Sequence, residues 1–269
     1  MVILRNGKFD PMTRGKGRPP TTYELSLCVA CGLINILFQY YLLYHGGALS
    51  FCKAIGYTNV IDVSETQKLL MMLLFVENQL HVDLRNIFIF QSAVFSKYTI
   101  GFVCLWVRTF MFAIFSITAY MGFGLLSPYW YALGLFVMLF FQIVEAKGDY
   151  DLKQFVLRKK AGETDKKKVC TEKSWSLTRH PNHFAFLQWW PVHALLATSN
   201  PWTVLYCIGF LHFWILCIGI PSNEQYMLDT YGKEYSDYQS SVPKLYPNWS
   251  DIMSYSKPKN LATVPLLKN

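Results

Sequence analysis

Four polar side chains crowd into one short stretch of this chain, Trp175–Phe184, and their types suit the binding of an anionic ligand. They are Arg179, His180, Asn182 and His183. Pro181 fixes its own φ and biases the residue before it away from helical geometry, so we predict a turn that opens a helix. The free N–H groups of a helix start, together with a permanent arginine charge, could hold an anionic cofactor. Anchoring of the helix at lipid headgroups is the alternative.

A second polar group lies inside the otherwise apolar stretch 66–96. Glu77, His81 and Arg85 recur at every fourth position, so they share one face of a helix. Ionisable groups at membrane depth are costly and usually face each other or a cavity. They predict either the polar wall of a substrate or cofactor cavity or, as we favour, a broken helix that surfaces at the membrane interface.

A third set of residues, all but one of them polar, lies near the C-terminus at spacings of four, three, four and three, which places it on one helix face. It consists of Glu224, Leu228, Tyr231, Tyr235 and Tyr238. This face could simply pack on the rest of the protein. It could also close a cofactor pocket, in which Glu224 and one or more tyrosine hydroxyls oppose the Arg179 turn, and the two interpretations are compatible.

The composition decides which elements position these groups. Of the 269 residues, 52% are hydrophobic and only 16% are charged, whereas a soluble domain averages roughly 25% charged residues. We therefore predict an all-α, polytopic transmembrane bundle of about six spans with a C-terminal amphipathic helix. The expected spans are 23–45, 66–96, 98–121, 129–145, 184–198 and 201–220, and the amphipathic helix is roughly 222–240. Ser64 is a candidate N-cap between a loop at 48–65 and the second span.

This pattern divides the chain into four parts. They are a flexible basic arm (1–22), N-terminal membrane helices (23–145), a C-terminal region (146–250) and a tail (251–269). Lysine and arginine concentrate in the arm, in the charged loop 146–178 and in the tail, so these should share the cytosolic or matrix side. An even number of crossings between them fits the predicted spans. We expect an integral protein of the endoplasmic reticulum or the mitochondrial inner membrane, with membrane lipids as partners.

Two other classes of function find little support. The aromatic residues lie inside apolar runs rather than on a basic face, so no nucleic-acid partner is expected. Cys28 and Cys31 have no second pair and no nearby histidine, so no metal site is expected either.

Three segments within roughly 140–250 carry a family resemblance. The sequence Arg179–Phe184, followed by Trp189-Trp190, is similar to RHPNYFGE…WW, and Gly148–Phe155 is similar to SDYxLRxL. Gly219–Glu224 and Tyr231–Pro247 are similar to GxP…E and YxxY…IP patterns. These are the patterns of steroid 5-alpha-reductase-like membrane proteins, a superfamily that also includes isoprenylcysteine and phospholipid methyltransferases.

The resemblance implies a bundle of six or seven spans that holds NADPH on the cytosolic side. It implies hydride transfer to a double bond conjugated with a carbonyl, in a hydrophobic substrate that enters from lipid. By position, Asp149, Asn182 and Tyr235 would contact the cofactor, and Arg179 and His180 would flank it. The methyltransferase branch would instead place S-adenosylmethionine against the same turn and Glu224.

Two positions depart from the family pattern. Phe186 stands where the family has glutamate, which removes a carboxylate from the expected cofactor wall. Lys173 replaces a usual glycine, so we expect a glycine-dependent turn to be absent. The leading hypothesis is an NADPH-dependent lipid reductase. The second is a catalytically silent relative that packs against partner transmembrane subunits of a membrane complex, and the third is an S-adenosylmethionine-dependent lipid methyltransferase.

Overall fold

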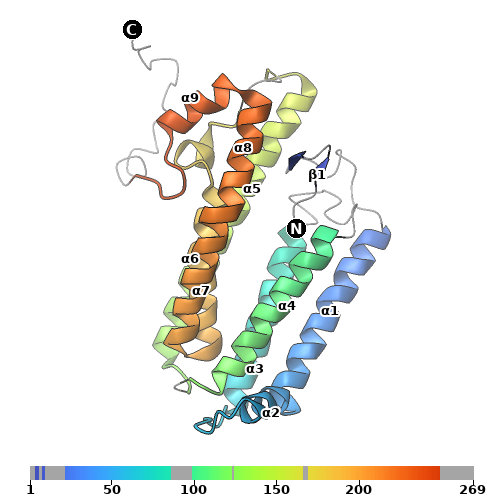
Figure 1. Ribbon diagram of the computed structural model, residues 1–269, viewed down its shortest axis with the longest axis vertical. Coiled ribbons are helices and arrows are strands. Elements are labelled where there is room, and N and C mark those ends of the chain that lie inside the picture. The colour runs from blue at the N-terminus through green and yellow to red at the C-terminus, as the bar shows by residue number, and fades with distance from the viewer. Residues whose placement is uncertain are drawn as a thin grey trace.

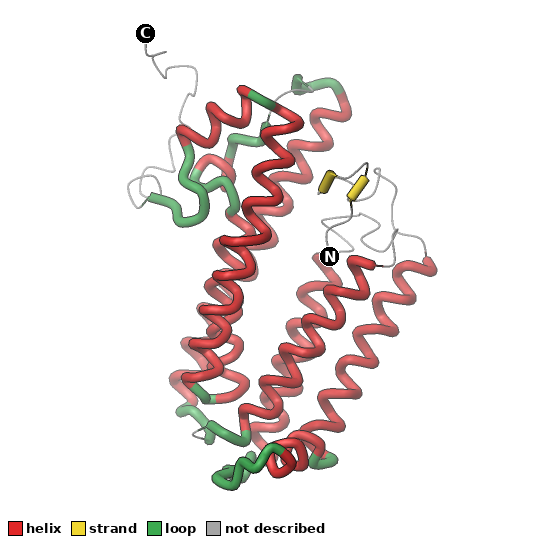
Figure 2. Tube along the Cα trace, in the orientation of Figure 1, coloured by secondary structure: helices red, strands yellow, loops and turns green. Residues whose placement is uncertain are grey.

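The structure, a computed structural model, describes residues 4–5, 8–9, 22–85, 99–122, 124–165 and 169–248. The described secondary structure is helical apart from one antiparallel pair of two-residue strands, β1 (Leu4–Arg5) and β2 (Lys8–Phe9). The all-α prediction is therefore confirmed. The molecule is elongated, with its long helices running along the long axis (Figures 1 and 2). Residues 86–96 of the expected span 66–96 and the whole tail 251–269 lie outside the described residues.

Nine α-helices are described. They are α1 (Thr22–Tyr44), α2 (Gly47–Ala54), α3 (Glu65–Leu84), α4 (Thr99–Ala119), α5 (Pro128–Ala161), α6 (Pro181–Thr198), α7 (Pro201–Trp214), α8 (Ile220–Tyr231) and α9 (Lys233–Ser241). A short 3-10 turn, Lys173–Ser176, precedes α6, and a π-helical segment, Ile215–Gly219, joins α7 to α8 into one rod.

Two of these rods are long and apolar enough to cross a membrane, by length and composition. They are α5 and the continuous stretch Pro201–Tyr231. In the most apolar 18-residue stretch of each, only 17% and 28% of the residues are buried inside the protein. Most of this apolar surface faces outward, as expected of helices whose solvent is lipid. Shorter apolar stretches occur at Val29–Tyr44 and Arg108–Ala119. The prediction of six spans stays a prediction.

Several local expectations are confirmed. Helix α1 begins and ends within one residue of the expected 23–45. Ser64 caps α3 by accepting a hydrogen bond from the backbone N–H of Gln67 at 3.3 Å. The hairpin of α6 and α7 turns at Ser199 and Asn200, and the Asn200 side chain donates to the carbonyls of Thr118 and Met121, each at 3.2 Å. That side chain therefore fixes the turn against the end of α4.

Three expected element boundaries are wrong. The loop expected at 48–65 contains the short helix α2. The span expected to end at 145 continues as helix α5 to Ala161, where Gly162 at φ 80° ends it, so the first part of the expected loop 146–178 is helical. The C-terminal helix breaks at Gly232 into α8 and α9. Hydropathy marks where apolar residues stop, but a helix continues until a cap or a glycine ends it.

The core lies where α3, α4 and α6 meet. Aromatic rings stack there in sequence, with centroid distances of 4.5 Å between Phe75 and Phe112 and 5.6 Å between Phe112 and His193. Trp190 packs on the same cluster. Burying these large side chains stabilises the bundle, and it fixes α6 relative to α3, the two helices that carry the polar groups described next.

Candidate functional site

The Arg179 turn and the C-terminal helices lie at the same end of the molecule, where α6 begins and α8 passes into α9 (Figure 1). Arg179 Nε donates to Glu224 Oε1 at 2.8 Å, and both residues are buried. Its Nη1 donates to the backbone carbonyls of Gln239 at 2.6 Å and Val242 at 3.0 Å. The guanidinium thus binds the two C-terminal helices to the start of α6.

His180 adds a second contact to the same carboxylate. Its Nε2 lies 3.2 Å from Glu224 Oε1, and its ring stacks on His183 at 5.4 Å. Burial lowers the pKa of His180, although the neighbouring Glu224 opposes this shift. Burial raises the pKa of Tyr235, and the nearby Glu224 carboxylate raises it further. The cluster therefore holds one guanidinium against one carboxylate, with a neutral imidazole and a neutral phenol beside them.

Asp149 and Asn182 form the adjoining contact between α5 and α6. Asn182 Nδ2 donates to Asp149 Oδ1 at 3.0 Å. The helices can approach because residue 148 is glycine: a Cβ there would lie 3.3 Å from Pro181 Cγ. Trp175 Nε1 donates to the Gly148 carbonyl at 2.9 Å and closes the turn over this contact.

The six residues expected to contact a cofactor therefore lie together at one end, in two groups of neighbouring side chains. One is Arg179, His180, Glu224 and Tyr235, and the other is Asp149 and Asn182. Their role in cofactor binding stays a prediction, because the arrangement shows their proximity alone.

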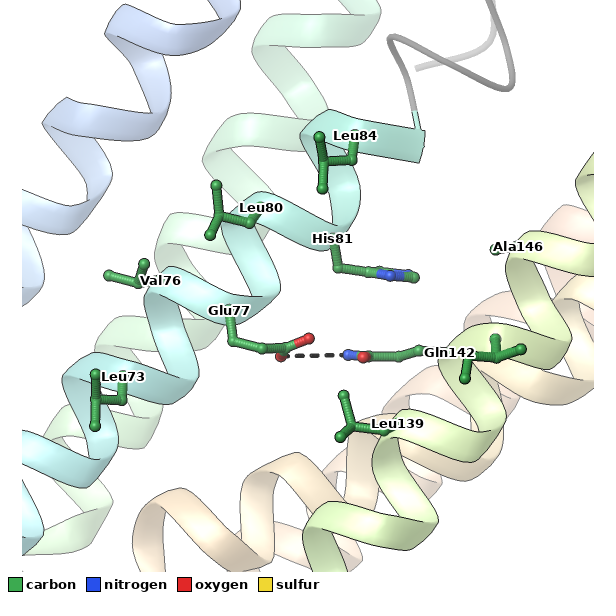
Figure 3. Close-up of a pocket in the computed structure, with 10 residues that line it drawn as sticks. Leu73, Val76, Glu77, Leu80, His81, Leu84, Leu139, Gln142 and Ala146 are labelled. Atoms are coloured by element: carbon green, nitrogen blue, oxygen red, sulfur yellow. Dashed lines mark hydrogen bonds between the residues drawn. The ribbon is translucent and has the colours of Figure 1, made fainter.

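A groove opens between α3 and α5, with a volume of about 450 Å³ (Figure 3). Apolar side chains of both helices form most of its lining, including Leu80, Leu84, Leu139 and Ile143. The polar lining residues are Glu77, His81 and Gln142. Gln142 Nε2 donates to Glu77 Oε2 at 3.4 Å, so one hydrogen bond crosses the groove from α5 to α3.

The polar residues of α3 therefore behave differently from the interpretation favoured on sequence grounds. Helix α3 runs unbroken through Glu77 and His81 to Leu84, so the expected break does not occur in the described part of 66–96. Its polar face lines the groove instead, because α5 supplies hydrogen-bonding and charged partners that offset the free-energy cost of burying these groups. This is the cavity-wall arrangement.

Glu145 is a residue that the sequence analysis missed. Its Oε2 accepts from Trp189 Nε1 at 2.8 Å and lies 3.5 Å from His81 Nε2. Its Oε1 is bound by Arg85, whose Nε lies 3.6 Å from Asp149 Oδ2. A chain of polar contacts thus connects the groove to the Asp149–Asn182 contact. The available signal was the spacing of Glu145 and Asp149, which places two carboxylates one turn apart on one helix face.

The two departures from the family pattern have different outcomes. Lys173 adopts φ 54°, the left-handed region that favours glycine, so the expectation that the turn is lost is wrong. Its Nζ lies 3.8 Å from Oδ1 of the buried Asp151. Phe186 packs against Trp189 and Trp190 at ring distances of 5.6 and 5.8 Å, so it belongs to the aromatic core.

Comparison with known proteins gives one match. The model of the family described as "Protein of unknown function (DUF1295)" matches residues 70–242, well over half of the chain. This range includes the groove and both groups of neighbouring side chains. No curated protein and no solved structure matches the chain. The chain belongs to the DUF1295 family.

Proposed function

We propose that this DUF1295 protein is an integral membrane reductase, similar to the steroid 5-alpha-reductase-like proteins. In this proposal it transfers hydride from NADPH to a carbon–carbon double bond conjugated with a carbonyl in a lipid. The observation that carries the proposal is the chain of polar contacts that joins the lipid-accessible groove to the Asp149–Asn182 contact through Glu145 and Arg85. A reductase needs its substrate site next to its cofactor site, because the hydride donor and the hydride acceptor must come into contact.

The groove supports a lipid substrate. Its walls are mostly apolar and it opens beside α5, whose outer surface suits lipid, so a hydrophobic molecule could enter sideways. A few polar groups within an apolar cavity fix the orientation of a ligand. Glu77, His81 and Gln142 supply such groups on the wall of the groove.

The side chains around Arg179 and Asn182 support a phosphate-bearing cofactor. Arg179, His180 and Asn182 carry N–H donors there, and the half-exposed side chains of Lys147 and Lys173 add positive charge nearby. The donor set therefore fits NADPH, with Asp149, Asn182 and Tyr235 as contacts and Arg179 and His180 beside them. Glu224 already binds the guanidinium, so a phosphate would have to share or exchange that partner. When bound, NADPH supplies the hydride.

The proposal includes a six-span topology. In Figure 1, α1 begins and α5 ends toward the side of the bundle that carries α9, and the last turn of α5 carries Arg158, Lys159 and Lys160. Under the positive-inside rule this end faces the cytosol or the matrix. We place the protein in the endoplasmic reticulum or the mitochondrial inner membrane.

Nucleotide titration tests the proposal. The purified protein in detergent is heated with NADPH or with S-adenosylmethionine, and the shift of the unfolding midpoint is recorded. Ligand at about 100 times its Kd should stabilise the folded state by about 2.7 kcal/mol. We expect stabilisation by NADPH, its reduction in Asn182→Ala, and no such reduction in the exposed-site control Gln225→Ala. Stabilisation by S-adenosylmethionine alone would replace the reductase with a lipid methyltransferase.

Two observations favour a second candidate, a catalytically silent accessory subunit of a membrane complex. Arg179 already has its charge balanced by Glu224 and its donors bound to two carbonyls, and Phe186 packs in the core where the family has a carboxylate. A protein that binds neither nucleotide and copurifies with a larger complex in fixed stoichiometry would be this subunit. In that case Phe186→Glu should recover some cofactor affinity, whereas in an active enzyme it should disturb packing and lower activity.

A further inference from the structure

We propose that the groove between α3 and α5 binds a long-chain lipid alcohol, whose terminal hydroxyl group is held by Glu77 and Gln142. This binding goes beyond the proposed function, because it requires neither NADPH nor a reduction. The two polar side chains lie on a mostly apolar wall beside α5, a helix that is long and apolar enough to cross a membrane. Polar groups in such a setting need hydrogen-bonding partners, because lipid supplies none.

The hydrogen bond between these two side chains is long. Gln142 Nε2 donates to Glu77 Oε2 at 3.4 Å, whereas N–H···O bonds in proteins most often measure about 2.9–3.0 Å. A carboxylate has two oxygens and can accept several hydrogen bonds. The Glu77 carboxylate, which lines the groove, therefore has capacity left for a ligand.

A hydroxyl group matches this pair because it both donates and accepts. It can donate to the Glu77 carboxylate while it accepts from the Gln142 amide, so it can insert into the long bond and replace it with two shorter ones. An ether or carbonyl oxygen only accepts, and it would leave the carboxylate without a donor. His81 is not needed for this pairing, because its Nε2 faces Glu145 Oε2 at 3.5 Å.

The position of the bond sets the orientation of the ligand. The bond crosses the groove, with Leu73 and Leu139 at one end and Leu84 and Ala146 at the other (Figure 3). Helix α5 is apolar on the side before Leu139 and becomes rich in charged residues beyond Ala146. The apolar body of the ligand therefore lies against Leu73 and Leu139, and its polar group ends at the crossing bond.

The lining favours a flexible chain over a rigid ring system. The apolar residues of the lining are all aliphatic, and none of the described lining residues is aromatic, so no flat surface faces a fused ring. Leu73 and Leu139 are 56% and 46% exposed and leave apolar surface for the ligand to cover. A flexible chain can follow the spaces between such branched side chains.

Photolabelling in the absence of nucleotide tests the proposal. The purified protein in phosphatidylcholine nanodiscs is irradiated with a hexadecanol that carries a photoreactive diazirine and an alkyne tag, and the labelled peptides are identified by mass spectrometry. We expect labels on the peptides that contain Leu73 and Leu139. Unlabelled 1-hexadecanol should suppress the labelling at a concentration about tenfold lower than its methyl ether does, because only the alcohol donates to Glu77.

Three variants locate the recognition. Glu77→Leu removes the acceptor and should abolish the preference for the alcohol over the ether. Glu65→Leu makes the same change on the same helix, at an exposed carboxylate that pairs with Lys68, and should behave like the parent protein. Leu139→Trp fills the groove without changing the polar pair, so it should lower the labelling, and it keeps the proposal testable if Glu77→Leu does not fold.

Three results would overturn parts of this proposal. Equal competition by the alcohol and its methyl ether in the parent protein would overturn the recognition of a hydroxyl group. Cholesterol that competes as well as 1-hexadecanol would overturn the choice of a flexible chain, and labels confined to other helices would overturn the groove as the binding site. Because NADPH is absent throughout, these results are independent of the reductase proposal, which the nucleotide titration tests separately.

Discussion

The guanidinium of Arg179 and the carboxylate of Glu224 lie 2.8 Å apart although 45 positions separate them in the chain. Both side chains are buried, and this pair attaches the C-terminal helices to the first turn of α6. Breaking one partner of a buried ion pair costs about 3–5 kcal/mol, because it leaves the other charge uncompensated. We therefore expect Arg179→Gln or Glu224→Gln to lower the free energy of unfolding in detergent by an amount of this order.

Two comparisons test that expectation. The double variant Arg179→Gln, Glu224→Gln should recover part of the loss, because it leaves no unpaired charge. Lys233→Ala, which removes an exposed pair with Asp237, should have no measurable effect. If either single variant unfolds like the parent protein, the pair does not attach the C-terminal helices.

His180 predicts a dependence of stability on pH. Burial holds its pKa below the ordinary value, so the folded state takes up its proton less readily than the unfolded state does. The free energy of unfolding should fall as the pH drops from about 6.5, the ordinary histidine pKa, toward the lower folded-state value. His180→Gln should flatten this part of the curve, measured by thermal unfolding across pH. A steeper curve in the variant would contradict the prediction.

Gly148 should be intolerant of larger side chains. A Cβ at this position would lie 3.3 Å from Pro181 Cγ, and the longer side chain of Gly148→Leu would separate α5 from α6. Overpacking typically costs about 1–3 kcal/mol, and the Asp149–Asn182 contact should be lost with it, so binding of NADPH should weaken as well. Gly209→Leu is the matched control, because no atom lies within 4 Å of a Cβ there. Equal effects of the two variants on stability would rule out this account.

Lys173 carries a backbone strain that glycine would relieve. A non-glycine residue in the left-handed region costs about 1–2 kcal/mol, and Lys173 lies there at φ 54°. Lys173→Gly should therefore maintain or raise the unfolding midpoint, although it gives up the ion pair with Asp151. Lys160→Gly, in the regular last turn of α5, should lower stability by about 1 kcal/mol. Two variants that shift the midpoint in the same direction would show that the strain is absent.

In this chain, hydrophobic runs show where helices lie, but they do not show where the helices end. Apolar runs predicted the helical class and the positions of α1 and α6 to within a few residues, because burial and lipid exposure both demand continuous hydrophobicity. They did not predict the end of α5. Its polar half still forms a helix, and the residue that stops it is Gly162 rather than the first charge.

In the candidate site, some residues could be predicted from the sequence pattern and others depend on how the helices pack. Family resemblance pointed to six residues that the fold brings to one end, with Asn182 bonded to Asp149 and Arg179 bonded to Glu224. It could not point to Glu145, because that residue lies at the edge of an apolar run and acquires meaning only when α3 brings Arg85 and His81 against it. Pairings between distant helices depend on packing, which no local pattern records.

The hydrogen bond from Gln142 to Glu77 has a bearing on which molecules can occupy the groove. In a membrane, the saturated acyl chains of lipids would surround this helix pair in great excess. Without the hydrogen bond, any of them could insert between α3 and α5. A bare methylene chain offers nothing to replace that bond, whereas a molecule with an oxygen at the same depth does. We therefore expect the hydrogen bond between α3 and α5 to disfavour saturated lipid tails in the groove relative to molecules that carry an oxygen.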